Sequence, residues 1–110
     1  MMRPALSVAA AGLLRSLLAR AGIDRDRIYL TDFRPTDWQS LTFVGERHEF
    51  SLRLPGTDAE RIVEQLTDRL EDVEWEIPGQ IVADIGLMSG PVESNDGSIT
   101  LTIEALTIAE

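Results

Sequence analysis

Residues 43–56 read "FVGERHEFSLRLPG" and are the most informative segment, because apolar and polar residues alternate along it. Alternation with a period of two is typical of a β-strand with one buried face. We expect Gly45 and Glu46 to form the centre of a type II′ turn, in which glycine supplies the positive φ angle. This register places Phe43 opposite His48. The face directed at the core then contains Leu41, Phe43, His48, Phe50, Leu52 and Leu54.

His48 is the chain's only histidine and the first candidate for a reactive residue. It is in phase with Phe50 and Leu52, which predicts a packed, hydrogen-bonded residue at the rim of the sheet. Imidazole titrates near neutral pH, and it acts as a general base only with an orienting partner. Arg47 and Glu49 cannot orient it, because alternation directs them to the opposite face. A distant aspartate stays open as a partner.

The segment before these strands predicts an amphipathic helix within residues 1–22. Arg15 lies on the polar face and interrupts the apolar run, which argues against a secretory signal, and no stretch is long enough to span a membrane. A short strand at residues 27–30 and a polar, proline-bearing connection at residues 31–38 follow. The apolar stripe of the helix recurs at helical spacing at Leu6, Ala10, Leu13 and Leu17.

The segment after Gly56 predicts a second helix, opened by a capping box between Thr57 and Glu60. Its other face is acidic, which is typical of a solvated surface. The acidic run "TDRLEDVE" lacks the glycine-punctuated spacing of calcium loops, so we expect no metal site there. The apolar stripe contains Ala59, Ile62, Val63, Leu66, Leu70 and Val73.

Three further strands are expected in the C-terminal part of the chain. Residues 73–77 alternate and stop at Pro78-Gly79, residues 81–88 form a longer strand, and "SNDG" forms a turn before the last strand. Asp84 alternates away from Ile85, which indicates an aspartate on the solvent face or at an edge.

The alternation of apolar and polar residues in the last strand is interrupted at Ala105 and Leu106, where two apolar residues are adjacent. A bulge, or a strand end covered on both sides, would explain this interruption.

The length of 110 residues and a hydrophobic content of 44% predict one domain over residues 1–110. We expect an α+β class, with two helices packed on one face of a mostly antiparallel sheet in the order α-β-β-β-α-β-β-β. The absence of cysteine excludes a disulfide framework and thiolate chemistry, and it is compatible with a cytoplasmic location. A net charge of −9 argues against sequence-specific nucleic-acid binding and against anionic membranes.

No chemical motif emerges from the sequence. The chain has no phosphate-binding glycine loop, no paired metal-ligand spacing and no nucleophile elbow. We therefore expect no enzyme, no catalytic, cofactor-binding or metal-binding residues, and no cofactor. A hydrolase using two carboxylates stays open, because acidic residues abound.

The order of elements and several strings resemble the tail-terminator, or tail-completion, proteins of long-tailed phages and gene transfer agents. The resemblance rests on the alanine- and leucine-rich first helix ending in "RIY", on "GERHEFSLRL" leading into the second helix, and on "LEDVEWEIPGQIV" followed by "DGSITLTIEAL". It spans most of the chain.

The resemblance implies a helix-backed sheet whose copies join in a ring that caps a tail tube and meets the head connector. The partners would be further copies of this chain and tail-tube and head-connector proteins, in the cytoplasm or in a virion-like particle. Copies carrying −9 each repel, so ring closure would need apolar or strand-edge contacts and should be favoured by salt. The alternative is a stand-alone α+β binding domain or small homodimer of unknown ligand.

Overall fold

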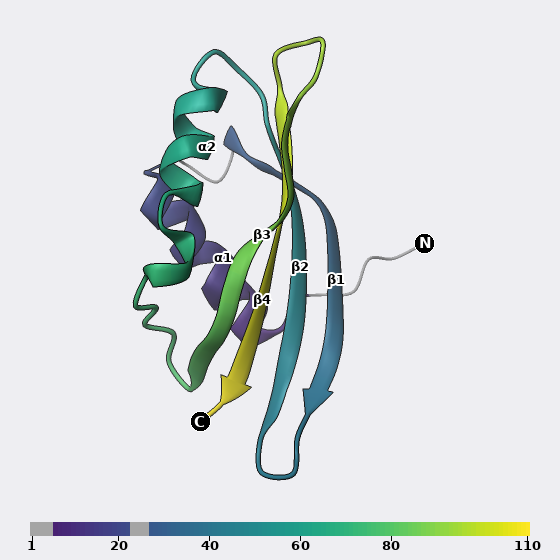
Figure 1. Cartoon of the computed structure of the whole chain (residues 1–110), viewed down its shortest axis with the longest axis vertical. Helices are drawn as coiled ribbons and strands as arrows, with labels where there is room; N and C mark the ends of the chain where they lie inside the picture. The colour runs from purple at the N-terminus through teal and green to yellow at the C-terminus, as the bar shows by residue number, and fades with distance from the viewer. Residues whose placement is uncertain (1–5, 23–26) are drawn as a thin grey trace.

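The structure is a computed structural model that describes residues 6–22 and 27–110. Within these ranges the chain folds into two helices packed on one face of a four-stranded antiparallel sheet (Figure 1). The elements are α1 (Val8–Ala21), β1 (Tyr29–Gln39), β2 (Val44–Leu54), α2 (Ala59–Thr67), the short 3-10 helix η2 (Leu70–Asp72), β3 (Gln80–Glu93) and β4 (Ile99–Ala109).

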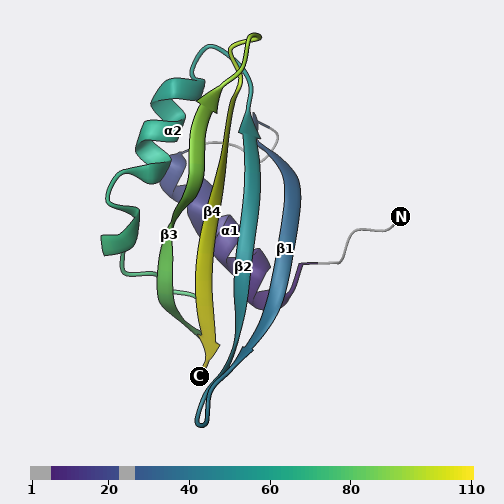
Figure 2. The same cartoon turned by 45° about the vertical axis from the view of Figure 1, so that its right-hand side comes forward.

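The strands lie in the order β1-β2-β4-β3, so β2 and β4 are central while β1 and β3 form the edges (Figure 2). Each of the two hairpins, β1–β2 and β3–β4, joins strands that follow each other in the chain. The chain therefore consists of two successive α-β-β units, which meet where β2 pairs with β4. This central pairing is regular from Gly45 opposite Ile108 to Leu54 opposite Ile99.

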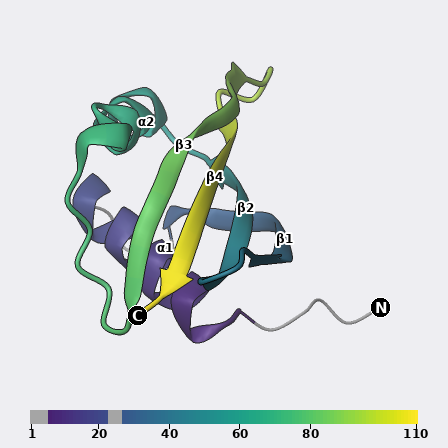
Figure 3. The same cartoon turned by 60° about the horizontal axis from the view of Figure 1, so that its bottom comes forward.

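The core lies between the helix layer and the covered face of the sheet (Figure 3). The expected apolar stripes are confirmed within the helices, because Ala10, Leu13 and Leu17 of the first and the members up to Leu70 of the second are buried, while Arg15 is exposed. Leu6 is partly buried and precedes α1. Arg20 ties the two helices together at their C-terminal ends: its guanidinium donates to the carbonyl oxygens of Leu66, at 3.1 Å, and of Asp68. The largest fully buried apolar side chains are Phe50, Leu13, Leu17, Leu52, Leu54, Ile62, Leu66 and Ile103.

The first hairpin differs from the expected one. Its turn lies at residues 40–43, where the amide of Ser40 donates to the carbonyl of Phe43 at 2.9 Å. Residues 31–38, expected to be a connection, belong to β1, so the expected short strand at 27–30 and the expected pairing of Leu41 and Phe43 before a Gly45 turn are replaced by one long strand that ends at Gln39. Polar residues and Pro35 fit this strand because it lies at the sheet edge, where one side of the backbone has no partner strand.

The element order is therefore α-β-β-α-β-β, with two strands fewer than expected. Residues 73–77 form no strand; Ile77 makes only an isolated bridge to Gln80 around the turn at Pro78-Gly79. Trp75 and Ile77 pack against the core from a loop, so their alternation reflects packing without strand pairing.

The expected capping box of the second helix is wrong. The helix begins at Ala59 after Asp58, and the Asp58 side chain makes no capping hydrogen bond. Its carboxylate instead lies 3.6 Å from Arg61 and 3.8 Å from Arg27.

Two features of the C-terminal hairpin bear on the sequence predictions. The glycine turn is confirmed, because Gly97 has a φ angle of 84°. The interruption at Ala105 and Leu106 marks a segment covered on both faces, since both residues are buried. The bulge lies in the neighbouring strand, where the register of β3 shifts between Val82 and Asp84.

Candidate functional site

His48 lies in the centre of the covered face of the sheet. Its side chain is 0% exposed, and Pro35 of β1 and Ala105 of β4 lie opposite it. The imidazole ring stacks on Phe50, with centroids 5.8 Å apart and planes inclined by 8°. The expected place at the rim opposite Phe43 is therefore wrong, because moving the turn to residues 40–43 shifts the register of the hairpin.

Polar side chains from three elements surround this imidazole. Its Nε2 atom lies 2.8 Å from the Oγ1 atom of Thr107 on β4, and its Nδ1 atom lies 3.5 Å from the Oε1 atom of Glu46 on β2. The hydroxyl of Ser7 donates to the same Glu46 oxygen at 2.5 Å and accepts from the amide of Ala10 at 3.0 Å. The His48 cluster, defined as Ser7, Glu46, His48 and Thr107, thus connects the N-terminal cap of α1 to both central strands.

The electrostatics of the cluster favour a neutral imidazole. Burial lowers the pKa of His48 from its ordinary value, and the nearby Glu46 carboxylate opposes this shift with a smaller effect. A side chain without exposed surface cannot touch a substrate, so the cluster has the residue types of a proton relay but not the access that catalysis requires. Its observable role is to join α1 to the sheet.

The other candidate residues lie where alternation places them. Arg47 and Glu49 flank His48 but are half-buried on the opposite face, so the tripeptide "RHE" is not a local constellation. Asp84 is exposed on the edge strand β3, as expected. In the described ranges, no group of three or more histidine or carboxylate side chains is arranged to hold a metal ion.

Glu46 was missed by the sequence analysis. The signal was its spacing, because residues 46 and 48 share one face of a strand. Placing Glu46 in the turn removed it from that face.

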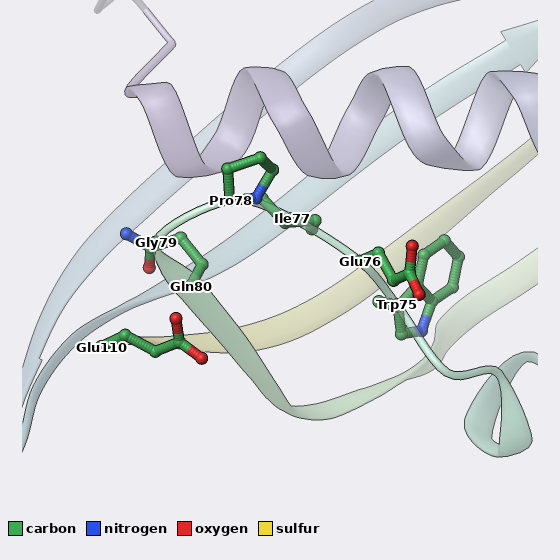
Figure 4. A pocket seen from close by; sticks show the side chains of 7 residues that line it. All are labelled: Trp75, Glu76, Ile77, Pro78, Gly79, Gln80 and Glu110. Carbon is green, nitrogen blue, oxygen red and sulfur yellow. The ribbon is translucent and has the colours of Figure 1, made fainter.

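The hollows of the surface are shallow and carry little chemistry. One, of about 430 Å3, is formed by the loop before β3 and by Glu110 (Figure 4). Its carboxylates, Glu76 and Glu110, project from separate segments, and the Nε1 atom of Trp75 has no hydrogen-bond partner among the described residues. Another, of about 180 Å3, lies between α1 and the start of β1; we name it the α1–β1 groove. Five of its six lining residues have aliphatic side chains and the sixth is tyrosine, while polar atoms also contribute to its surface; the residues are Leu14, Leu18, Ile28, Tyr29, Leu30 and Leu52.

The end of the first hairpin is an exposed apolar surface. We name residues 38–45 the hairpin end; their sequence, "WQSLTFVG", contains no charged residue. Leu41 is fully exposed, Phe43 is 52% exposed and Val44 is 64% exposed. Figure 1 shows this hairpin projecting beyond the C-terminal end of β4. An uncharged apolar projection on a chain of net charge −9 is the feature of this molecule most typical of an interaction surface.

The two edge strands are poorly suited to continuous pairing with another sheet. β1 contains Pro35, while β3 contains Pro91 and three shifts of register. Proline cannot donate a ladder hydrogen bond, and bulges distort the edge, so both features oppose edge-to-edge association. Side-chain contacts are therefore the more suitable means of association.

The negative charge is concentrated on the helix side of the molecule. Residues 58–76 carry eight carboxylates and two arginines, which is −6 of the chain's −9. The hairpin end belongs to the sheet layer and projects beyond it (Figures 1 and 2). A second molecule can therefore approach the hairpin end with less repulsion than it meets at α2.

The comparisons with known proteins add no assignment: no family model, curated protein or solved structure matches this chain. Among the described residues, no helix is both long and apolar enough to cross a membrane.

Proposed function

We propose that this protein is a non-enzymatic assembly protein that resembles phage-type tail terminators and forms a ring at the end of a tail tube. The observation that carries the proposal is the uncharged, apolar hairpin end projecting from an otherwise acidic molecule. The helix-backed antiparallel sheet is also the architecture that the resemblance implies. Further copies of the chain, tail-tube proteins and head-connector proteins are the proposed partners.

The burial of the one histidine supports a role in contact over a role in catalysis. His48 has no exposed surface, and its polar neighbours serve to join α1 to the sheet. Association then depends on apolar contacts that overcome the repulsion between acidic copies. Salt should strengthen it, because the Debye length falls to about 3 Å at 1 M ionic strength.

Sedimentation velocity as a function of salt tests this proposal. We expect a monomer or small oligomer at low salt and a larger closed species near 1 M salt. The variant Phe43→Ser should weaken this association, whereas Met88→Ser, at a comparably exposed apolar position on β3, should not. A monomer at every salt and protein concentration would exclude the ring.

A stand-alone binding domain is the second candidate, and the hollow beside Trp75 favours it. The Trp75 indole N–H is buried and has no hydrogen-bond partner among the described residues, so a ligand acceptor would reach it only by displacing the loop before β3. Quenching of Trp75 fluorescence by a small molecule in a Trp38→Phe background, with no change in sedimentation, would support this alternative.

A further inference from the structure

The hairpin end and the α1–β1 groove are complementary in chemistry and lie at opposite ends of the molecule. The groove is at the start of β1, beside Tyr29, and the hairpin end follows Gln39 (Figures 1 and 2). β1 has 11 residues, so at a rise of about 3.3 Å per residue the two features are separated by about 33 Å. They cannot meet within one molecule, but they can meet between two.

The size of the groove suits one apolar side chain. Its volume of about 180 Å3 is smaller than the range of about 300–1,000 Å3 that is typical of small-molecule pockets. An apolar protein cavity of about 150 Å3 binds benzene, so the groove can accommodate a phenyl ring. Phe43 is the exposed aromatic residue of the hairpin end.

The charges beside the two features are also complementary. Asp37 precedes the hairpin end and is exposed, whereas Arg27 adjoins the groove-lining residue Ile28 and its side chain is 48% exposed. A contact that inserts the hairpin end of one molecule into the groove of another would bring this carboxylate toward this guanidinium, which also lies 3.8 Å from the Asp58 carboxylate of its own molecule. Opposite charges at a rim favour one orientation of the partners over others.

We propose that copies of this chain associate head to tail, with Phe43 of one copy seated in the α1–β1 groove of the next. This inference rests on the proposed function, since it names the contact by which the copies assemble. The two surfaces in such a contact differ, so an open assembly keeps a free hairpin end on one terminal copy and a free groove on the other until it closes. A heterologous contact of this kind produces a ring when the rotation between copies closes.

Disulfide trapping tests the contact, because the chain contains no cysteine. Val44→Cys, next to Phe43, and Tyr29→Cys each introduce one thiol at an exposed position and leave the Phe43 ring in place. Mild oxidation of an equal mixture should give a covalent dimer with one copy of each variant, and neither variant should crosslink by itself. A chain carrying both substitutions should give a ladder of linked copies. Met88→Cys replaces Tyr29→Cys in the control, and its mixture with Val44→Cys should give little product.

The outcomes separate this inference from the proposed function. Crosslinking of Val44→Cys with itself would show that hairpin ends meet each other, and equal crosslinking to Met88→Cys would show a nonspecific contact; either result overturns the head-to-tail arrangement. Absence of the 44–29 disulfide in a protein that still sediments as a large oligomer overturns the inference alone. A monomer under all conditions overturns both proposals.

Discussion

The Oε1 atom of Glu46 lies 3.5 Å from the Nδ1 atom of His48 and also accepts a hydrogen bond from the hydroxyl of Ser7. One carboxylate thus holds the cap of α1 and lies beside the chain's only imidazole. Because the imidazole is buried, the protonation of His48 is linked to the stability of the fold.

Acid should destabilise the protein from about pH 6.5 downward. Burial lowers the folded-state pKa of His48 below its ordinary value of about 6.5, so in this window the unfolded chain binds a proton that the folded chain does not. The free energy of unfolding then falls with pH, by at most about 1.4 kcal/mol per pH unit from this residue. Denaturant unfolding between pH 7.5 and pH 5 measures the slope. NMR should show the single imidazole titrating below pH 6.5; stability that is constant or rises on acidification would contradict the prediction.

The exposed carboxylate of Asp96 does not complicate this pH window. Hydrogen bonds from the Ser98 hydroxyl and the Ser98 amide, together with the contact to Arg53, lower the pKa of Asp96 to about 2. Asp96 stays ionised from pH 7.5 to pH 5.

Replacement of His48 by alanine should destabilise the protein by about 2–5 kcal/mol, the range for removing a large buried side chain. The ring is 0% exposed, stacks on Phe50 and bonds to Thr107, so truncation leaves a cavity and a buried hydroxyl without its partner. Thr107→Val, which removes the hydroxyl alone, should cost less. Chemical denaturation measures both, and a cost below about 0.5 kcal/mol for His48→Ala would contradict the packing described here.

Gly45→Ala should destabilise the central pairing of β2 with β4 by about 1–3 kcal/mol, as overpacking does elsewhere. A Cβ atom on Gly45 would lie 2.2 Å from the carbonyl oxygen of Thr107, so the backbone would have to move. Gly86→Ala is the control, because its Cβ would meet only the Glu71 side chain at 3.5 Å. Thermal melts compare the two variants, and equal stabilities would contradict the prediction.

Glu104→Arg should stabilise the fold by about 0.2–1 kcal/mol at low ionic strength. Glu49 and Glu104 lie directly opposite each other on the central strands, where like charges repel. Glu93→Arg changes the net charge equally but lies opposite Ile99, so it isolates the effect of the pair. The difference between the two variants should shrink as salt is added; a salt-independent difference would argue against an electrostatic cause.

The sequence predicted the parts of the fold that depend on local periodicity. The buried stripe through Leu13 and Leu17, the alternation around Phe50 and the glycine turn at Gly97 are all confirmed. Each of these is governed by residues within one turn of helix or a few positions along a strand.

The first hairpin was misplaced because glycine has two uses in strands. Gly45 was interpreted as a turn residue, but here its missing side chain allows a close approach to the backbone of β4. β1 was not predicted at its full length because an edge strand needs few buried residues; Phe33 is its one buried position. The partnership of His48 with Thr107 joins residues far apart in sequence, so no local pattern could have indicated it.

The two successive α-β-β units also mean that the chain can be divided into two halves of the same topology. β2 and β4 run antiparallel beside each other with β1 and β3 outside them, so an approximate two-fold axis perpendicular to the sheet relates the hairpins near Glu49 and Glu104. The segment between Leu54 and Ala59 is the one covalent link between the units. If that link is cut, the seam between β2 and β4 becomes an interface between two polypeptides, each of which exposes an unpaired strand edge until the other restores the sheet. The two units are thus arranged as the subunits of a dimer would be, but they are joined in one chain, and the protein should assemble from two separately expressed fragments.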